Sequence, residues 1–532
     1  MSQMLKSGGA MAGATLLSRV LGLVREICYA RFMGNGMVAG AFLLAFMVPN
    51  LFRRLLGEGA LTSAFVPVFK DKEVKEGEAA MWEAANGVLS GLFCLVALIV
   101  GVVLAVVSAV LAWGAPAENT RLMLELLRWM FPYMGFVCLA GVMMGMLNAR
   151  RHFFVPALAP VIMNVILIFS VVWLAPTLEG GLEGQVFALA FGVLAAGVAQ
   201  FLYQWPWLRR EGFRWRWQRP WGNATVARVA RNLGPATVGA AGVQINLVLT
   251  MAMGFWAGDH LVASFGFAVR LMEFPQGLFG VSLAAFLLPT LSGLASNGKE
   301  EEFRATLAEG LWHMIYINLL MMCLLLVLAE PMVRLLFEHG ELFTAESTRQ
   351  VAFALQCLSP ALVFYSMGGI LTRAFHARED MVTPMKVTLF CVVLNGGLVA
   401  LFLFTDWFSL EKKQGAFGIA NAVTACVSVL LLGGAFERRW GRIDLGGEQG
   451  RRTAGAAILG VLLAFGAAWG LASGAVQWWG TEGLWARLAG VFVPVAGAGL
   501  VYAAVGAWLG AGTMRDLAAI LRERGDGDDD GN

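Results

Sequence analysis

The stretch FPYMGFVCLAGVMMGMLNARRHFFVP at residues 131–156 aligns without gaps with SPALVFYSMGGILTRAFHAREDMVTP at residues 359–384, 228 positions later. The two copies are identical at six aligned pairs: Pro132 and Pro360, Phe136 and Phe364, Gly141 and Gly369, Ala149 and Ala377, Arg150 and Arg378, and Pro156 and Pro384. Self-similarity at a fixed spacing indicates an internal repeat. The chain is therefore expected to consist of two related halves.

Composition places this repeat in a membrane. Of the 532 residues, 58% are hydrophobic and 14% are charged, whereas soluble domains carry roughly 25% charged residues. A membrane-spanning helix needs about 20 apolar residues. Fourteen apolar stretches are separated by short connections, at 8–29, 37–56, 87–113, 127–149, 156–175, 184–205, 229–256, 262–294, 308–328, 350–375, 384–405, 415–436, 453–473 and 486–510. These features exclude a water-soluble globular protein.

The repeat predicts how the spans are grouped. It places the fourth and fifth spans on the tenth and eleventh, and a shift by an even number of spans keeps their direction. We expect an all-α polytopic membrane protein of about 14 transmembrane helices, with two parallel six-helix lobes and two C-terminal helices. The expected boundaries are 1–222 and 223–445 for the lobes, 446–512 for the last two helices, and 513–532 for a disordered acidic tail. Transporters built from such repeats bind substrate between their halves and alternate access.

Basic loops predict the orientation. Lys and Arg concentrate in alternate loops, for example 209–219 and 438–452, and the opposite loops are short or acidic. By the positive-inside rule, both termini are expected in the cytoplasm. The loop WPWLRREGFRWRWQRPWGN at 205–223 interleaves Trp with Arg, as nucleic-acid-binding segments also do. Anionic membrane surfaces attract the same residues, so no nucleic-acid partner is expected.

The first span carries charges inside its apolar stretch. Its segment SRVLGLVRE contains Arg19, Arg25 and Glu26, and at about 1.5 Å per residue Arg19 lies near the middle of the bilayer. On a helix, Arg25 shares a face with Ser18 and Gly22, whereas Arg19 shares one with Gly22 and Glu26. Because such residues are costly to insert, they are functional candidates by default.

The second and eighth spans contain further arginines. The second ends in PNLFRRLLGEGALTSAFVPVF, with Arg53, Arg54 and Glu58. The structural alternative for these arginines is a side chain that reaches the membrane surface, with Arg54 and Glu58 paired at i, i+4. The eighth span contains Arg270, for which the alternative is a local pair with Glu273.

The eighth span is also expected to bend. Segment 262–294 is longer than one crossing needs, and it contains Pro275, Gly277 and Gly280. Proline and glycine are common sites of helix kinks. A bent helix beside an arginine inside the membrane suits a gated cavity.

These charges together predict an anionic substrate. The four arginines at 19, 25, 53 and 270 are opposed by Glu26 and Glu273, which leaves a net charge of about +2. Guanidinium binds phosphate oxygens in a bidentate fork, so a phosphate or pyrophosphate headgroup is favoured and organic cations are disfavoured. The sequence has no HExxH motif, paired-carboxylate cluster or Gly-rich nucleotide loop. Neither an enzyme nor an ATP-driven pump is therefore indicated.

The segments SRVLGLVRE, PNLFRRLLGEGALTSAFVPVF and RLMEFPQGLFGVSLAAFLLPTLS resemble the MurJ (MviN) family of lipid II flippases, within the multidrug/oligosaccharidyl-lipid/polysaccharide (MOP) exporter superfamily. The similarity covers essentially the whole chain. It implies two six-helix lobes around a cationic cavity in the bacterial cytoplasmic (inner) membrane. The implied substrate is lipid II, undecaprenyl-pyrophosphate-MurNAc-pentapeptide-GlcNAc, moved from the inner to the outer leaflet for peptidoglycan synthesis. Membrane lipids and cell-wall synthesis and division proteins are the implied partners.

The resemblance also implies roles for single residues. Carried over position by position, Arg19, Arg25 and Arg270 bind the pyrophosphate and sugar end, and Arg53 helps the inward gate. The residues expected to support or gate this site are Ser18, Gly22, Glu26, Arg54, Glu58, Glu273 and Pro275. Helices at 453–473 and 486–510 are expected to hold the polyprenyl tail in a hydrophobic groove.

Several positions depart from the family pattern. Many relatives have Asp where this chain has Gly40 and Val269, so their gating pairs are not carried over. Some relatives bind sodium through acidic residues that are missing here, and Asn395 and Thr424 are weak candidates for the remains of such a site. We expect no cofactor and no strong sodium binding. The expected energy source is the membrane potential, at roughly 2.3 kcal/mol per charge per 100 mV.

Other functions are weighed against this one. An exporter of another polyprenyl-pyrophosphate-linked glycan shares the anionic headgroup, whereas a cation-coupled drug exporter is disfavoured by the arginines. A membrane scaffold for cell-wall assembly needs no charged cavity. A membrane-bound transferase needs an acid or histidine constellation that the sequence lacks.

Overall fold

The computed structural model describes residues 2–57, 60–277, 281–405, 407–409 and 412–515. Every regular element in these ranges is helical. The chain divides into two compact units. The first consists of the residues up to Ala263 together with Gly340–Phe343, and the second consists of Ser264–His339 and the residues from Thr344 onward. The all-helical prediction is therefore confirmed for the described residues. Of the expected disordered tail at 513–532, residues 513–515 are described and helical, and the rest lies outside the described residues.

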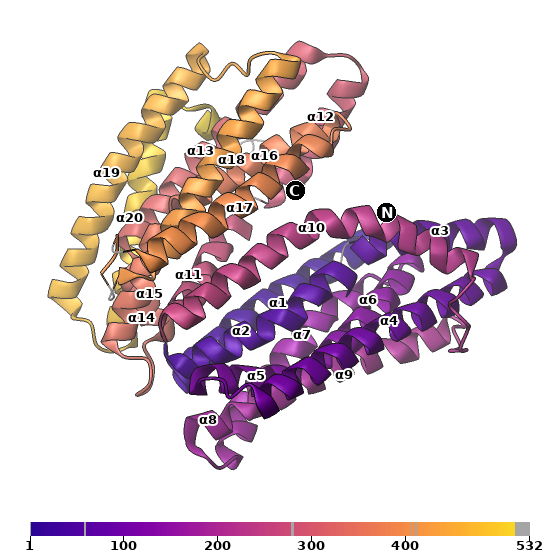
Figure 1. Cartoon of the computed structure of the whole chain (residues 1–532). Helices are drawn as coiled ribbons and strands as arrows, with labels where there is room; N and C mark the ends of the chain where they lie inside the picture. Colours follow the sequence, from indigo (N-terminus) through magenta and orange to yellow (C-terminus); the bar gives the residue numbers. More distant parts are fainter. Residues whose placement is uncertain (1, 58–59, 278–280, 406, 410–411, 516–532) are drawn as a thin grey trace. The chain divides into compact units, whose positions relative to one another are not determined.

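The first unit is a bundle of long helices (Figure 1). Its α-helices are α1 (Ser2–Met33), α2 (Met37–Phe52), α3 (Ala60–Glu76), α4 (Glu78–Trp113), α5 (Glu118–Met130), α6 (Tyr133–Ala149), α7 (Phe154–Phe169), α8 (Gly181–Gln185), α9 (Phe187–Arg210) and α10 (Ala224–Ala257). Three short segments continue α2 and α7, namely the π-helical η1 (Arg53–Gly57) and η2 (Ser170–Leu174) and the 3-10 helix η3 (Ala175–Thr177). Helix α10 packs against α2, α3 and α4, and Asn223 caps its beginning by accepting hydrogen bonds from the Thr225 and Val226 amides.

The second unit contains the remaining helices (Figure 1). They are α11 (Leu261–Pro275), α12 (Val281–Ser296), α13 (Glu300–Val327), α14 (Ala329–Phe337), α15 (Ala345–Leu358), α16 (Ala361–Ala377), α17 (Val382–Phe404), α18 (Gly415–Trp440), α19 (Glu448–Trp479) and α20 (Leu484–Leu509). One buried cluster joins α12, α13, α16 and α18 around Phe303, Phe375 and Phe436. The predicted boundaries at 222/223 and 445/446 stay predictions.

Helices α19 and α20 pack on each other and on α13. Tyr316 and Tyr502 hold this contact together, because each hydroxyl donates to the other's backbone carbonyl, at 3.1 and 2.7 Å. Gly506 is required here, since a Cβ added to it would lie 1.9 Å from the Tyr316 hydroxyl. The last two predicted helices are thus fixed to the second half of the repeat.

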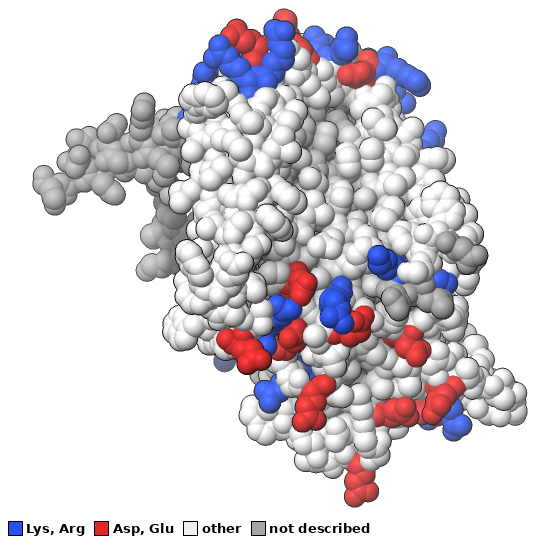
Figure 2. Space-filling model, turned by 90° about the vertical axis from the view of Figure 1, so that its left-hand side faces the viewer, with Lys and Arg blue, Asp and Glu red and all other residues white. Residues whose placement is uncertain are grey.

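Nine helices in the described residues are long and apolar enough to cross a membrane, or eleven if two bent pairs each form one span. The remaining predicted spans coincide with α1, α10 and α11–α12. Helix α1 carries Arg19, Arg25 and Glu26 within its apolar part, which lowers its hydropathy. The face in Figure 2 has a broad band without charged side chains, and Lys and Arg dominate one end. The polytopic character is confirmed, and the count of fourteen stays a prediction.

The repeat is visible in the backbone. The pair α5–α6 bends by 40° and the pair α15–α16 by 41°, and Pro132 and Pro360 precede the second helix of each pair. Both second helices are followed, directly after the C-cap, by a residue with positive φ, Arg151 at 67° and Glu379 at 60°. The two bends and the two left-handed residues lie 228 positions apart, so the sequence match reflects a repeated local structure.

Candidate functional site

The buried charges of α1 form one connected group. Arg25 forms an ion pair with Glu26, and its Nη1 donates to Asn164 Oδ1 of α7 at 2.9 Å. Asn164 Nδ2 in turn donates to the Ser18 carbonyl at 3.0 Å. A Cβ added at Gly22 would lie 3.7 Å from Asn164 Nδ2. The structure thus brings Ser18, Gly22, Arg25 and Glu26 together through one amide that the sequence analysis did not select.

Burial makes this group sensitive to change. The Arg25 and Glu26 side chains are 13% and 7% exposed, and Asn164 is also buried. The Arg25 guanidinium lies 5.5 Å from the centre of the Tyr29 ring. Removing one member of a buried ion pair leaves an uncompensated charge and costs about 3–5 kcal/mol. The Arg25 side chain is therefore held in place by α1 and α7.

Arg19 is placed differently on the same helix. It is exposed, as are the neighbouring apolar side chains Leu16, Val20 and Leu23. A guanidinium among exposed apolar side chains is available to an anionic group that approaches this face. The helix therefore presents one fixed and one accessible arginine.

Arg53 and Arg54 begin the π-helical segment η1 at the end of α2. Arg53 is half-buried and Arg54 is exposed. Arg54 Nη1 donates to Gln244 Oε1 of α10 at 3.2 Å. The predicted partner of Arg54, Glu58, lies outside the described residues. Short π-helical segments often occur at functional sites. This one carries two arginines, and it brings Arg54 into contact with α10.

Arg270 forms the local pair that the sequence analysis gave as the structural alternative. Its Nη1 lies 2.8 Å from Glu273 Oε2, and both side chains are almost half exposed. This pair is local to α11, as the i, i+3 spacing of the two residues allows. Helix α11 ends at the buried Pro275, and Val269, directly before Arg270, is half-buried. The predicted bend of segment 262–294 stays a prediction, because Gly280 lies outside the described residues.

Gly40 allows a close approach within the first unit. A Cβ added to it would lie 3.4 Å from the Asp259 carbonyl oxygen and 3.7 Å from Phe255 Cδ2. In this chain Gly40, at the position where many relatives have Asp, therefore packs against the end of α10.

The weak sodium candidates lie next to each other in the second unit. Asn395 and Thr424 are both buried, and Asn395 Nδ2 donates to Thr424 Oγ1 at 3.5 Å. Across the described residues no group of three or more His, Cys, Asp or Glu side chains gathers to hold a metal. Sodium coupling stays untested.

Comparison with known proteins identifies the family. A family model described as lipid II flippase MurJ matches residues 29–490. The chain belongs to the MurJ family of lipid II flippases. It is 35% identical over 82% of its length to a probable lipid II flippase MurJ of Rhizobium meliloti, covering 82% of that protein. It is 34% identical over 79% of its length to the lipid II flippase MurJ of Burkholderia cenocepacia, covering 81% of it.

Solved structures agree at the level of the fold. A MurJ structure in an inward closed conformation matches with a TM-score of 0.76 at 20% identity, covering 96% of this chain and 99% of that one. An inward-facing multidrug resistance MATE transporter of the MOP superfamily matches with a TM-score of 0.66 at 17% identity, covering 81% and 98%. The chain therefore has the fold of the MOP superfamily, and its family makes it a multi-pass transporter.

Two further residues of this MurJ-family chain escaped the sequence analysis. Asn164 is a single amide in an apolar stretch, and it gives no charge signal. Arg373 of α16 lies half-buried in the tenth predicted span, and its Nη1 donates to the Gly369 carbonyl at 3.3 Å. A search for every arginine inside a span, rather than for those in the first, second and eighth, finds it.

Proposed function

We propose that this protein moves lipid II from the inner to the outer leaflet by alternating access, with arginines of α1, η1 and α11 recognising its pyrophosphate. Membership of the MurJ family supports the substrate, and the parallel repeat supports the mechanism. The observation that carries the proposal is the α1 group, in which Arg25 is fixed by Glu26 and Asn164 while Arg19 stays exposed.

The chemistry follows from the state of each arginine. Guanidinium remains protonated and offers a planar fork of donors to phosphate oxygens. Arg25 already has its partners, so it supplies a fixed positive charge without the entropy cost of ordering a long side chain on binding. Arg19 is exposed, and Arg270 exchanges its local pair with Glu273 for the substrate. Arg53 contributes to the inward gate.

The polyprenyl tail needs an apolar surface of its own. Helices α19 and α20 expose large apolar side chains, among them Trp469, Phe492 and Leu500. We assign the tail to these helices, so that the flexible chain stays in lipid contact while the charged head crosses.

Energy, orientation and partners complete the proposal. A net positive charge that moves with the substrate site couples transport to the membrane potential, at roughly 2.3 kcal/mol per charge per 100 mV. By the positive-inside rule, the basic loops support a cytoplasmic location of both termini. Cell-wall synthesis and division proteins are the proposed protein partners.

Growth complementation tests this proposal. A strain depleted of its own lipid II flippase is expected to grow when it produces this chain. The variants Arg19→Ala, Arg25→Ala and Arg270→Ala are each expected to abolish growth when the amount of inserted protein is matched to wild type. Arg121→Ala, on an exposed face of α5, serves as the control and retains growth. Full growth in all three variants contradicts the cationic-site mechanism. If the chain instead rescues a strain that lacks a different glycan exporter, its substrate is another polyprenyl-pyrophosphate-linked glycan.

A further inference from the structure

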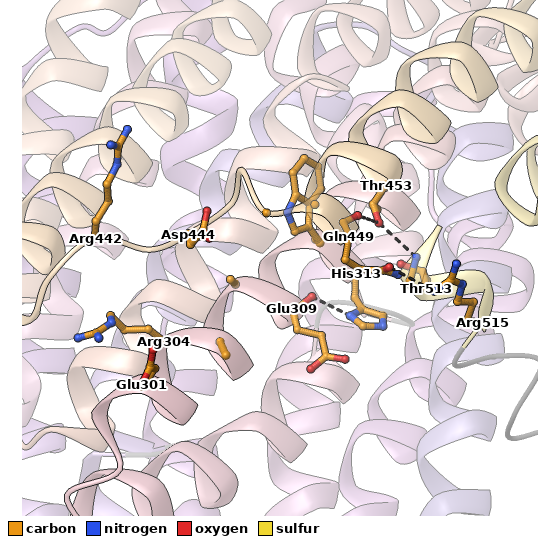
Figure 3. Close-up of a pocket in the computed structure, with 16 residues that line it drawn as sticks. Glu301, Arg304, Glu309, His313, Arg442, Asp444, Gln449, Thr453, Thr513 and Arg515 are labelled. Carbon is orange, nitrogen blue, oxygen red and sulfur yellow. Dashed lines mark hydrogen bonds between the residues drawn. The ribbon is translucent and has the colours of Figure 1, made fainter. Parts of the chain in front are cut away.

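A cavity of about 710 Å³ lies in the second unit, where the beginnings of α13 and α19 meet the residues that follow α20 (Figure 3). Its lining includes none of the arginines of α1, η1 and α11. Its wall includes Trp312, one turn before Tyr316 on α13, and Thr453 of α19. The cavity therefore lies at the end of the helical contact that Tyr316 and Tyr502 hold together.

Two hydrogen-bonding groups in the wall have no partner within the described residues. Thr513 is 6% exposed, and its Oγ1 forms no hydrogen bond there. Trp312 Nε1 is likewise buried without an acceptor. Gly450 makes room for this indole, since an added Cβ would lie 2.9 Å from Nε1. An indole N–H only donates, so the wall is prepared for a ligand that supplies acceptor oxygens.

Charges of both signs line the same cavity without pairing. The six ionisable side chains other than His313 are Glu301, Arg304, Glu309, Arg442, Asp444 and Arg515. Within the part of the chain that the structure describes, none of the six forms an ion pair with another. Arg304 Nη1 donates to the Trp440 carbonyl at 3.0 Å instead, and Arg515 Nη1 to Gln449 Oε1 at 3.4 Å. Three guanidinium groups and three carboxylates, formally neutral in sum, suit a ligand that also carries both charges.

We propose that this cavity binds the phosphoethanolamine headgroup of a membrane phospholipid. Thr513 Oγ1, Trp312 Nε1 and Arg515 donate to the phosphate oxygens. Glu309 accepts from the ammonium, because it lies three residues before Trp312 on α13 and therefore on the same side of the helix. A headgroup with only negative charge leaves the three carboxylates of the lining uncompensated.

The intact lipid is the expected source of this headgroup. Helix α19 begins at the cavity and continues with exposed apolar side chains, including Ile458 and Leu462. These side chains contact acyl chains once the helix is in a bilayer. Free phosphoethanolamine gains only the polar contacts, so it is expected to bind more weakly than the lipid.

Native mass spectrometry of the full-length protein in detergent tests the proposal. The probes are short-chain phosphatidylethanolamine, phosphatidylglycerol with the same acyl chains, and free phosphoethanolamine. The wild-type protein is expected to bind phosphatidylethanolamine about tenfold more tightly than phosphatidylglycerol. Thr513→Val is expected to weaken phosphatidylethanolamine binding about tenfold, and Glu309→Gln to remove the preference between the lipids. Glu302→Gln, whose residue pairs with Lys299 and lies outside the cavity wall, leaves both affinities unchanged.

Three outcomes overturn the proposal. If the wild-type protein binds phosphatidylethanolamine and phosphatidylglycerol with equal affinity, the carboxylates of the cavity do not recognise the ammonium group. Binding of free phosphoethanolamine as tight as that of the lipid assigns the cavity to a soluble ligand. If Thr513→Val does not fold, Arg515→Gln replaces it, and an unchanged affinity for phosphatidylethanolamine in the folded variant shows that the lipid binds elsewhere.

Discussion

Arg150 and Arg378 lie 228 positions apart and form the same ion pair in the two halves of the chain: each contacts the glutamate that begins a long helix. Arg150 Nη2 lies 3.4 Å from Glu78 of α4, and Arg378 Nη1 donates to Glu300 of α13 at 2.7 Å. A second contact repeats with the basic and acidic residue types exchanged. His152 Nε2 lies 2.7 Å from Glu211 in the first half, and at the equivalent positions Asp380 pairs with Arg439. The basic turns of the repeat therefore fasten corresponding helix ends in each unit.

Replacing Arg150 is expected to loosen the first of these turns. Besides Glu78, Arg150 contacts Glu73 at 2.9 Å and Glu211 at 2.8 Å. In Arg150→Gln the three carboxylates repel one another, and the free energy of unfolding is expected to fall by about 1–3 kcal/mol. Thermal unfolding in detergent measures this change, with Arg151→Gln as the control for a neighbouring exposed arginine. Equal unfolding midpoints for the two variants contradict the role of Arg150.

The same turn predicts a dependence on pH. The hydrogen bond from His152, followed by that from Arg150, lowers the pKa of Glu211 from its ordinary value of 4.5. A carboxylate with a lowered pKa stabilises the folded state fully above its ordinary pKa, and this contribution is lost as pH falls through the lowered value. The stability difference between wild type and Glu211→Gln is therefore expected to be constant just above pH 4.5 and to vanish in stronger acid. A difference that grows on acidification contradicts this assignment.

Asn164→Ala is expected to disconnect α1 from α7. The variant removes the acceptor of Arg25 and the donor to the Ser18 carbonyl, and each lost buried hydrogen bond costs about 1–3 kcal/mol. Transport is expected to fall at least about tenfold because Arg25 is no longer fixed. The measurement is lipid II exposure per unit of inserted protein. Asn297→Ala, which removes an exposed amide and its hydrogen bond to the Gly293 carbonyl, is the control, and equal activity of the two variants shows that Asn164 has no positioning role.

Restoring the acid that many relatives have at position 40 is expected to harm this chain. The Asp259 carbonyl oxygen lies 3.4 Å from where a Cβ would stand, so a buried carboxylate in Gly40→Asp faces another oxygen. The expected loss is about 2 kcal/mol or more, and Gly40→Ala is expected to lose less. Unfolding midpoints of the two variants test this order, and a Gly40→Asp protein as stable as wild type contradicts it.

Sequence alone predicted the helical fold because long apolar stretches mark membrane-spanning helices. It predicted the repeat because the two copies still align without gaps. The match of residues 131–156 to 359–384 extends in the structure to equal bends and equal left-handed turn residues. The face shared by Arg25, Ser18 and Gly22 followed from helical geometry. Its connecting residue did not, since Asn164 comes from another helix and only tertiary packing brings it near.

Other features depend on contacts that no local pattern encodes. The cavity at Thr513 is built from segments about 200 residues apart, so no motif marks it. The packing of α10 against α2, α3 and α4 gives the first unit a helix beyond its six predicted spans. The i, i+3 spacing of Arg270 and Glu273 also could not decide whether Arg270 pairs locally or binds a substrate, because that spacing allows a local pair without requiring it.

The most direct test of the central claim is a measurement of lipid II exposed on the outer leaflet in cells depleted of their own flippase. Cells that produce this chain are expected to regain exposure, and cells that produce Arg19→Ala or Arg25→Ala at the same level are expected not to. Unrestored exposure with the wild-type chain inserted in the membrane contradicts the account.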